Sequence, residues 1–169
     1  FGSFDSTGVW NPKEFALPAP NDNKTWSGMV SGTALTGYAF TSGFDGDTTT
    51  GMEADSDTYA TFTPTSPITA NSEIRINIYM RGSTSSTNYN LIVNGTSEFH
   101  EAHAVTGTND QAWYTLKDRT LTSLRFGEDN DSAKWMRIYA IEVDGVILVD
   151  GQTDETVRTN IYPGNNTGA

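Results

Sequence analysis

Apolar and polar residues alternate most clearly along residues 73–81, which read Glu-Ile-Arg-Ile-Asn-Ile-Tyr-Met-Arg. Successive side chains of an extended chain point to opposite sides, so Ile74, Ile76 and Ile78 share one side and the polar residues between them share the other. The pattern predicts a strand with one face in a hydrophobic core and one face toward solvent.

Shorter strand-like runs occur at residues 89–93, 113–116 and 121–126, each bounded by Gly, Asn, Asp or Ser. Residues 137–149 hold two apolar runs separated by Asp144-Gly145, a pair typical of type I′ hairpin turns because both central residues need a positive φ. No stretch keeps the apolar spacing of a helix over three turns. The chain is therefore predicted to be an all-β, antiparallel β-sandwich of the jelly-roll kind, with a barrel as the less favoured alternative.

Two segments lack any periodic pattern, residues 1–25 with their prolines and residues 152–169. Such segments are typical of arms or linkers, which leaves residues 26–151 as the predicted β-sandwich domain. The first residue is Phe rather than Met, so we expect a processed product or a piece of a longer polypeptide.

The 169 residues are enough for one domain with a real core, and the chain has no cysteine, so it has neither disulfides nor thiolate metal sites. Its net charge of −11 would repel phosphate backbones and anionic membrane surfaces, so neither nucleic acid nor a membrane is expected as a partner. The longest apolar run, residues 146–149, is far shorter than the roughly 20 residues that a membrane span needs. The acidic, Thr-, Ser-, Asn- and Gly-rich composition is typical of an exposed surface in a salty medium.

The stretch "GFDGDTTTG" at residues 43–51 concentrates oxygen ligands in a flexible segment. Asp45 and Asp47 could turn toward one hollow if the glycine between them allows a sharp bend, and Ca²⁺ accepts such an all-oxygen shell. The spacing does not match an EF-hand loop. The alternative is a simple turn in which the aspartates accept hydrogen bonds from nearby backbone N–H groups.

The motif "AFTSGFDGDTTT", followed about ninety residues later by "RIYAIEVDG", resembles the discoidin-type, galactose-binding-like β-sandwich family. The resemblance covers roughly residues 26–150. It implies a structural calcium ion bound by Asp45, Asp47 and Thr50. The family's late strand adds a glutamate.

At the position aligned with that glutamate the chain has Ala140, and Glu142 lies two residues further along, on the same face of a strand. Glu142 is therefore the candidate fourth ligand through a shift in register. The alternatives are a more weakly held ion or an ion-free loop.

The combination of "FDGD" with "IEVDGVILVDG" also resembles segments of tail-fibre and other surface proteins of marine bacteriophages. This resemblance implies an exposed adhesin or decoration domain on a virion, or more broadly an extracellular location.

Aromatic residues are the candidate sugar-binding groups, because sugar C–H groups stack on flat rings. Trp113 and Trp135 lie at the ends of apolar runs and are predicted to be core residues. Trp26 and Tyr89 adjoin polar stretches and are the predicted ligand-binding residues.

Catalysis is not expected. The chain has no nucleophile elbow, phosphate-binding glycine loop or cysteine nucleophile, and carboxylate pairs arise by chance among 21 acidic residues. The favoured function is a non-catalytic virion surface or tail-fibre domain that contacts a cell-surface glycan or neighbouring virion subunits. A homo-oligomer is compatible with this function, although the sequence has no heptad or collagen-like repeat.

Two further functions are alternatives to this one. The first is a carbohydrate-binding module of a secreted bacterial polysaccharide-degrading enzyme, which a catalytic domain in the full gene would favour. The second is a ligand-free structural subunit of a fibril or capsid.

Overall fold

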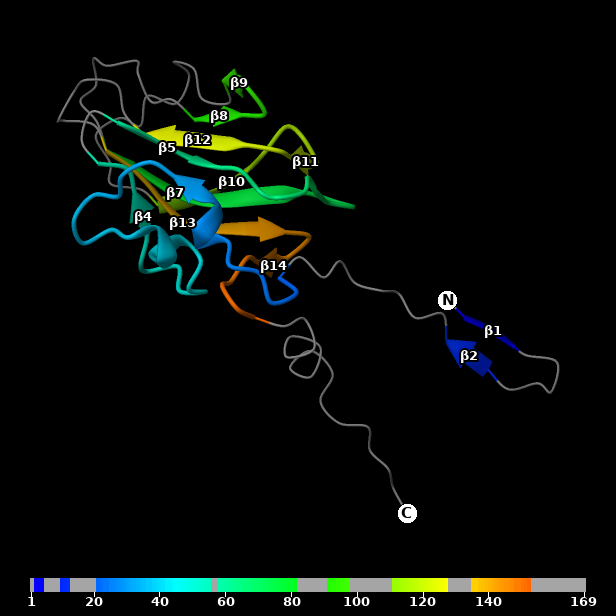
Figure 1. Ribbon diagram of the computed structural model, residues 1–169. Helices are drawn as coiled ribbons and strands as arrows, with labels where there is room; N and C mark the ends of the chain where they lie inside the picture. Colours follow the sequence, from blue (N-terminus) through cyan, green and yellow to red (C-terminus); the bar gives the residue numbers. More distant parts are fainter. Residues whose placement is uncertain are drawn as a thin grey trace.

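A computed structural model describes residues 2–4, 10–12, 21–55, 58–81, 91–97, 111–127 and 135–152. Over these residues the chain is all-β, and its helical turns are two short 3-10 segments, η1 (Ser27–Met29) and η2 (Phe40–Gly43). Neither these segments nor any other described helix is long and apolar enough to cross a membrane. The strands pair antiparallel and form two layers (Figure 1), which confirms the predicted antiparallel β-sandwich.

The first layer is a five-stranded sheet in which β10, β7, β13 and β14 follow one another and β4 pairs with a further part of β13. The bounds of its strands are β4 (Met52–Glu53), β7 (Ile74–Arg81), β10 (Gln111–Thr115), β13 (Trp135–Val143) and β14 (Val146–Ile147). The two longest strands, β7 and β13, are neighbours and form the centre of this sheet.

The second layer has the order β3, β5, β12, β8 and β9. The bounds of its strands are β3 (Val30–Ser31), β5 (Tyr59–Phe62), β8 (Ile92–Val93), β9 (Thr96–Ser97) and β12 (Leu124–Gly127). Two short pairs stand apart from the large sheets: β6 (Ile68–Thr69) with β11 (Thr120–Leu121), and β1 (Gly2–Phe4) with β2 (Trp10–Pro12).

The hydrophobic core lies between the facing sides of the two sheets. Strand β7 contributes Ile74, Ile76 and Ile78, all buried, as the alternation of its sequence predicts. From the second layer, Phe62 of β5 packs edge-on against the Trp26 ring, with 6.2 Å between the ring centroids. Phe44 lies near the start of the loop at residues 43–51 that carries Asp45 and Asp47, here called the acidic loop. It also contacts Phe62, at 5.4 Å between the ring centroids. The acidic loop therefore starts from a residue anchored in the core.

Two hairpin turns have the backbone geometry of type I′. Asp144 and Gly145 have φ angles of 50° and 85°, and Val143 pairs with Val146, which confirms the predicted turn between β13 and β14. Asn94 and Gly95 have φ angles of 51° and 80° and connect β8 to β9. The second turn was not predicted, although an Asn-Gly pair carries the same signal.

The other predicted strands differ from the observed ones in their limits. The run at 121–126 is divided between β11 and β12, which pair with different partners. The run at 113–116 corresponds to β10, which begins two residues earlier and ends one residue earlier. Of the run at 89–93, residues 89 and 90 lie outside the described residues and β8 covers the end.

A β-bulge in β13 sets which side chains of this strand face outward. Ile138 pairs with Ile78, but Ala140 pairs with Asn77, so Tyr139 is an extra residue on the β13 side. Beyond the bulge, Glu142 pairs with Arg75 and shares the outer face with Ala140. The expectation that Ala140 and Glu142 share a face is therefore confirmed.

A clasp joins the start and the end of the packed body. Asn21 is fully buried and donates from Nδ2 to the Ile147 carbonyl at 2.9 Å. Its Oδ1 accepts from the Val149 backbone N–H at 2.8 Å and from Trp26 Nε1 at 3.0 Å. Gln152 extends the clasp, because its carbonyl accepts a backbone hydrogen bond from Asn23 at 2.9 Å.

This clasp bears on the expected limits of the domain. Residues 21–25 and Gln152 were assigned to the arms, but the hydrogen bonds of Asn21, Asn23 and Gln152 include them in the packed body. Within residues 1–25, Gly2–Phe4 and Trp10–Pro12 pair as strands. Residues 153–169, the rest of the expected C-terminal arm, lie outside the described part of the chain.

Candidate functional site

The outer face of the first sheet carries a group of polar side chains around one exposed tryptophan. Strand pairing aligns Trp113 with Asn77, Thr115 with Arg75, and Arg75 with Glu142. We call this group the Trp113 face; its residues are Glu73, Arg75, Gln111, Trp113, Thr115 and Glu142. It is built from β10, β7 and β13, whose opposite sides form the core.

Trp113 is 37% exposed, and among the described residues it is the one large hydrophobic side chain that is exposed to this degree. The guanidinium carbon of Arg75 lies 4.9 Å from the centroid of its ring, which is the geometry of a cation–π contact. Trp113 was predicted to be a core residue, and this prediction is wrong. Its strand lies at the edge of the sheet, where it has β7 as a neighbour on one side only within the described residues.

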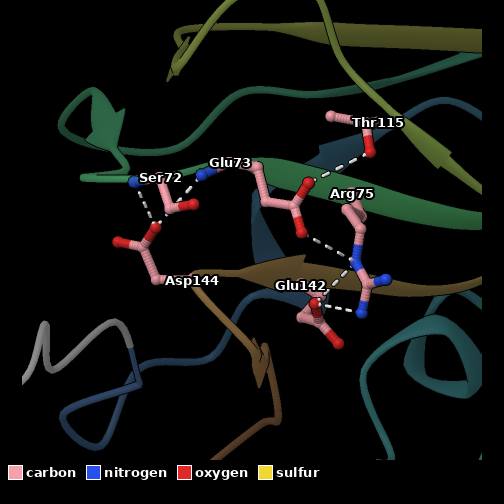
Figure 2. Close-up of polar contacts among 6 residues, drawn as sticks. All are labelled: Ser72, Glu73, Arg75, Thr115, Glu142 and Asp144. Atoms are coloured by element: carbon pink, nitrogen blue, oxygen red, sulfur yellow. Dashed lines mark hydrogen bonds and ion pairs between the residues drawn. The ribbon is translucent and has the colours of Figure 1, made fainter.

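Arg75 is held by the carboxylate of Glu142 on β13 and by that of Glu73, which directly precedes β7 (Figure 2). Its Nη2 lies 2.6 Å and its Nε 2.8 Å from Glu142 Oε1, and its Nε lies 3.5 Å from Glu73 Oε1. The hydroxyl of Thr115 donates to Glu73 Oε2 at 3.2 Å. The side chain of Glu142 is only 9% exposed, whereas those of Arg75 and Glu73 are 33% and 40% exposed. A partly exposed guanidinium therefore lies beside the Trp113 ring, and two carboxylates hold it there.

Asp144 holds residues 71–73, the segment that leads into β7, through backbone hydrogen bonds (Figure 2). Its carboxylate accepts backbone hydrogen bonds from Asn71 and Ser72, both at 2.7 Å, and from Glu73 at 3.1 Å. Burial acts to raise the pKa of Asp144, but these three donors and the charge of Arg119 outweigh it and lower the pKa below its ordinary value. The charged form of Asp144 therefore holds the β13–β14 turn against the start of β7.

The acidic loop at residues 43–51 lies against the same outer face. Gln111 Nε2 donates to the Thr48 carbonyl at 2.7 Å and to Asn77 Oδ1 at 2.8 Å. At the end of the loop, a Cβ on Gly51 would approach Arg137 Cγ of β13 to 2.7 Å, so only glycine allows this close packing. The loop is thus attached to the edge strand and packed on the central strand of the sheet.

A second ion pair secures the sheet beneath the loop. Arg137 donates from Nη2 and Nε to Glu53 Oε2, at 2.8 and 3.0 Å. Its guanidinium carbon lies 3.7 Å from the centroid of the Tyr38 ring. Burial acts to lower the pKa of Arg137, but Tyr139 and Glu53 outweigh it and raise the pKa above its ordinary value. The side chain of Glu53 is 4% exposed, so this pair is almost fully enclosed.

Within the loop, each aspartate accepts hydrogen bonds from residues that follow it. Asp45 Oδ1 accepts from the Asp47 backbone N–H at 2.8 Å, and its Oδ2 accepts from the Thr50 hydroxyl at 2.5 Å. Asp47 Oδ1 accepts from the backbone N–H and the hydroxyl of Thr49, both at 2.8 Å, and both bonds lower the pKa of Asp47. These bonds are those expected of the turn interpretation.

The predicted calcium ligands fall into two groups. Asp45, Asp47 and Thr50 lie together in the loop, but the carboxylate of Glu142 is bound to Arg75. No group of three or more His, Asp or Glu side chains arranged to hold a metal ion occurs among the described residues. The structure therefore does not bring Glu142 together with the two aspartates as a set of metal ligands. Calcium binding by the loop oxygens stays a prediction.

The two predicted ligand-binding aromatics have different outcomes. Trp26 is 2% exposed, packs on Phe62 and donates to Asn21, so its ring is part of the core and is not available as an exposed platform. Its role as a ligand platform is therefore corrected, because the clasp covers it. Tyr89 lies outside the described residues.

The arrangement can offer a ligand three kinds of contact. The exposed ring of Trp113 can stack on an apolar surface, Glu73 presents acceptor oxygens, and Arg75 presents donors. A few placed polar groups around an aromatic surface are the usual components of a small-ligand or glycan site. No protein-family model, curated protein or solved structure matched the chain in comparisons with known proteins.

Proposed function

We propose that the chain is a non-catalytic recognition domain of a virion surface or tail fibre, and that it binds a cell-surface glycan on the Trp113 face. The observation that carries this proposal is an exposed tryptophan stacked on an arginine that two glutamates hold in place. Glycan binding needs a flat apolar ring bordered by fixed hydrogen-bonding groups, and this face has both.

The geometry supports recognition because the polar groups are already held in position before a ligand arrives. The Arg75 guanidinium contacts the Trp113 ring, Glu142 and Glu73, so its orientation is restricted. A preformed site loses less conformational entropy on binding than a mobile one. The side chain of Trp113 loses little freedom on binding, because a tryptophan has only two rotatable side-chain bonds.

The virion location rests on the sequence resemblance and on the acidic composition. The same face would also serve a carbohydrate-binding module of a secreted polysaccharide-degrading enzyme, because both functions require the same contacts with sugars. The genes beside the coding sequence distinguish the two: capsid, portal or terminase genes favour the virion protein, and an adjoining catalytic domain favours the module.

A glycan array followed by calorimetry tests the proposal. The wild-type chain should bind at least one class of glycan, and Trp113→Ala should weaken that binding by at least about tenfold, as expected for a central aromatic contact. Trp113→Tyr should retain part of the affinity because it keeps a flat ring. The matched control is Ser66→Ala, an exposed position in the loop between β5 and β6.

Two results would contradict the proposal. A wild-type chain that binds no glycan at any concentration tested would favour the ligand-free structural subunit. Glycan binding that is unchanged in a folded Trp113→Ala variant would place the site elsewhere on the molecule.

A further inference from the structure

The Trp113 face carries more negative than positive charge. Its one cationic side chain, Arg75, is shared by Glu142 at 2.6 Å and Glu73 at 3.5 Å. The face therefore has two carboxylates for one guanidinium. Glu142 is nearly buried, so the negative charge that a ligand meets from solvent is mainly that of Glu73, whose side chain is 40% exposed.

Arg75 is poorly placed to receive an anion. Both its Nε and its Nη2 point to the same oxygen of Glu142, and one side of its guanidinium faces the Trp113 ring. A bidentate arginine site for a carboxylate or sulfate needs two adjacent N–H groups free to donate in parallel. Here the Nε and Nη2 edge is already occupied by a protein carboxylate.

The acidic loop beside the face adds to this negative charge. Gln111, on the same strand as Trp113, is hydrogen-bonded to Thr48 in the acidic loop, where Asp45 and Asp47 are both exposed. The chain as a whole carries a net charge of −11. An anionic polymer would therefore be repelled both at a distance and at the face itself.

We propose, on the basis of the glycan-binding function above, that the Trp113 face selects uncharged glycans and rejects acidic ones, and that Glu73 is the residue that sets this specificity. Sugar hydroxyls donate to the carboxylate of Glu73, while the C–H face of the sugar ring stacks on Trp113. A uronate or sulfate ester at the same position brings a further negative charge beside Glu73. At about 4 Å in water such a pair is unfavourable by a factor of roughly five in affinity.

The test compares matched oligosaccharides on the wild-type chain and on two variants. Galactan and galacturonan oligosaccharides of equal length and with the same α-1,4 linkage differ mainly in a carboxylate at C6, so their ratio of affinities isolates the effect of charge. Glu73→Gln removes the exposed negative charge and keeps an oxygen that can accept from Thr115. The matched control is Asp22→Asn, which removes one charge from an exposed position in the turn at residues 21–24. Sulfated galactan extends the comparison to a second kind of anion.

The wild-type chain should prefer galactan to galacturonan by at least about fivefold at low salt. Glu73→Gln should reduce this preference by about fivefold, because it removes the charge that repels the uronate. Asp22→Asn should leave the preference unchanged. Added salt should weaken the discrimination, because exposed charges are screened over roughly 10 Å at 0.1 M salt.

Three outcomes would contradict the inference, and they separate it from the function on which it rests. Binding of galacturonan or sulfated galactan as tightly as galactan, with loss of both in Trp113→Ala, overturns the charge selectivity and leaves the glycan site in place. Equal effects of Glu73→Gln and Asp22→Asn on the preference also overturn the selectivity, because the overall charge of the chain would then account for it. Failure of every neutral and acidic glycan to bind overturns the proposed function, and the selectivity with it.

Discussion

Gln111 on the edge strand β10 donates a hydrogen bond of 2.7 Å to the carbonyl oxygen of Thr48 in the acidic loop. The same amide nitrogen reaches Asn77 on β7 at 2.8 Å. The loop that carries Asp45 and Asp47 is therefore connected directly to the strand that carries Trp113. A change in the conformation of the loop can therefore affect the proposed binding face through the side chain of Gln111.

Calcium binding by Asp45, Asp47 and Thr50 predicts that EDTA lowers the melting temperature. An ion bound only to the native state stabilises it by about 2.7 kcal/mol at a hundredfold excess over Kd. Asp45→Ala should lower the melting temperature without any chelator, and EDTA should have no further effect on this variant. That last comparison separates loss of the ion from loss of the hydrogen bonds that Asp45 makes within the turn.

Melting curves of the wild-type chain that coincide with and without EDTA would rule out a stabilising ion. The turn interpretation would then account for the loop by itself, because both aspartates already accept hydrogen bonds from the residues that follow them.

The Glu53–Arg137 pair should contribute far more to stability than the Glu73–Arg75 pair. Glu53→Gln leaves a largely enclosed guanidinium without its counter-charge, which should lower the free energy of unfolding by about 3 kcal/mol. Glu73→Gln changes a carboxylate that is 40% exposed, and should lower it by less than about 1 kcal/mol. Urea denaturation of the two variants beside the wild type measures both values. Equal losses would show that the enclosure of Glu53 has no energetic consequence.

Asp144 should make the free energy of unfolding depend on pH under acidic conditions. Its pKa in the folded chain lies below its ordinary value, so its charged form stabilises the fold above the unfolded-state pKa near 4. This stabilisation is lost as the pH falls through the folded-state pKa. Asp144→Asn, which still tolerates a positive φ, should lower the free energy of unfolding by about 1 kcal/mol at neutral pH.

Measurement of unfolding at a series of pH values checks this prediction. The difference between the wild type and Asp144→Asn should be constant above about pH 5 and should shrink as the pH falls below about 4. A difference that does not change with pH would mean that the negative charge of Asp144 does not strengthen its hydrogen bonds with the backbone N–H groups of residues 71–73.

Local signals in the sequence were enough to predict the framework of the fold. The alternation at Ile74, Ile76 and Ile78 identified the central strand and its buried face. The Asp144-Gly145 pair identified the hairpin, because only a few residues tolerate a positive φ at both positions. These features depend on residues that are close together in the chain.

The roles of the two tryptophans could not be predicted in this way. Trp26 is next to polar residues in the sequence, yet it is covered by contacts with Phe62 and by a clasp that reaches Val149. Trp113 lies in an apolar run, yet its strand ends the described sheet and leaves the ring exposed. Exposure was decided in both cases by distant parts of the chain. The exposure predicted for the two rings was therefore the reverse of the exposure observed.

The bulge did leave a signal in the sequence. The buried residues Met136 and Ile138 are two apart, as are Ile141 and Val143, but three positions separate Ile138 from Ile141. In a strand with strict alternation, buried residues are always separated by an even number of positions, so the interval of three is irregular. The change of spacing places one extra residue between Ile138 and Ile141, and the strand pairing identifies it as Tyr139.

That extra residue, taken up by the bulge, determines toward which face of the sheet each later side chain of β13 points. If β13 kept Tyr139 but continued from Ile138 in strict alternation, without the bulge, Ile141 and Val143 would turn toward water and the carboxylate of Glu142 would be directed into the hydrocarbon interior. The anion that orients Arg75 beneath the indole would then be lost along with the interior packing. A single backbone irregularity thus allows one strand to supply apolar side chains to one side and a charge to the other.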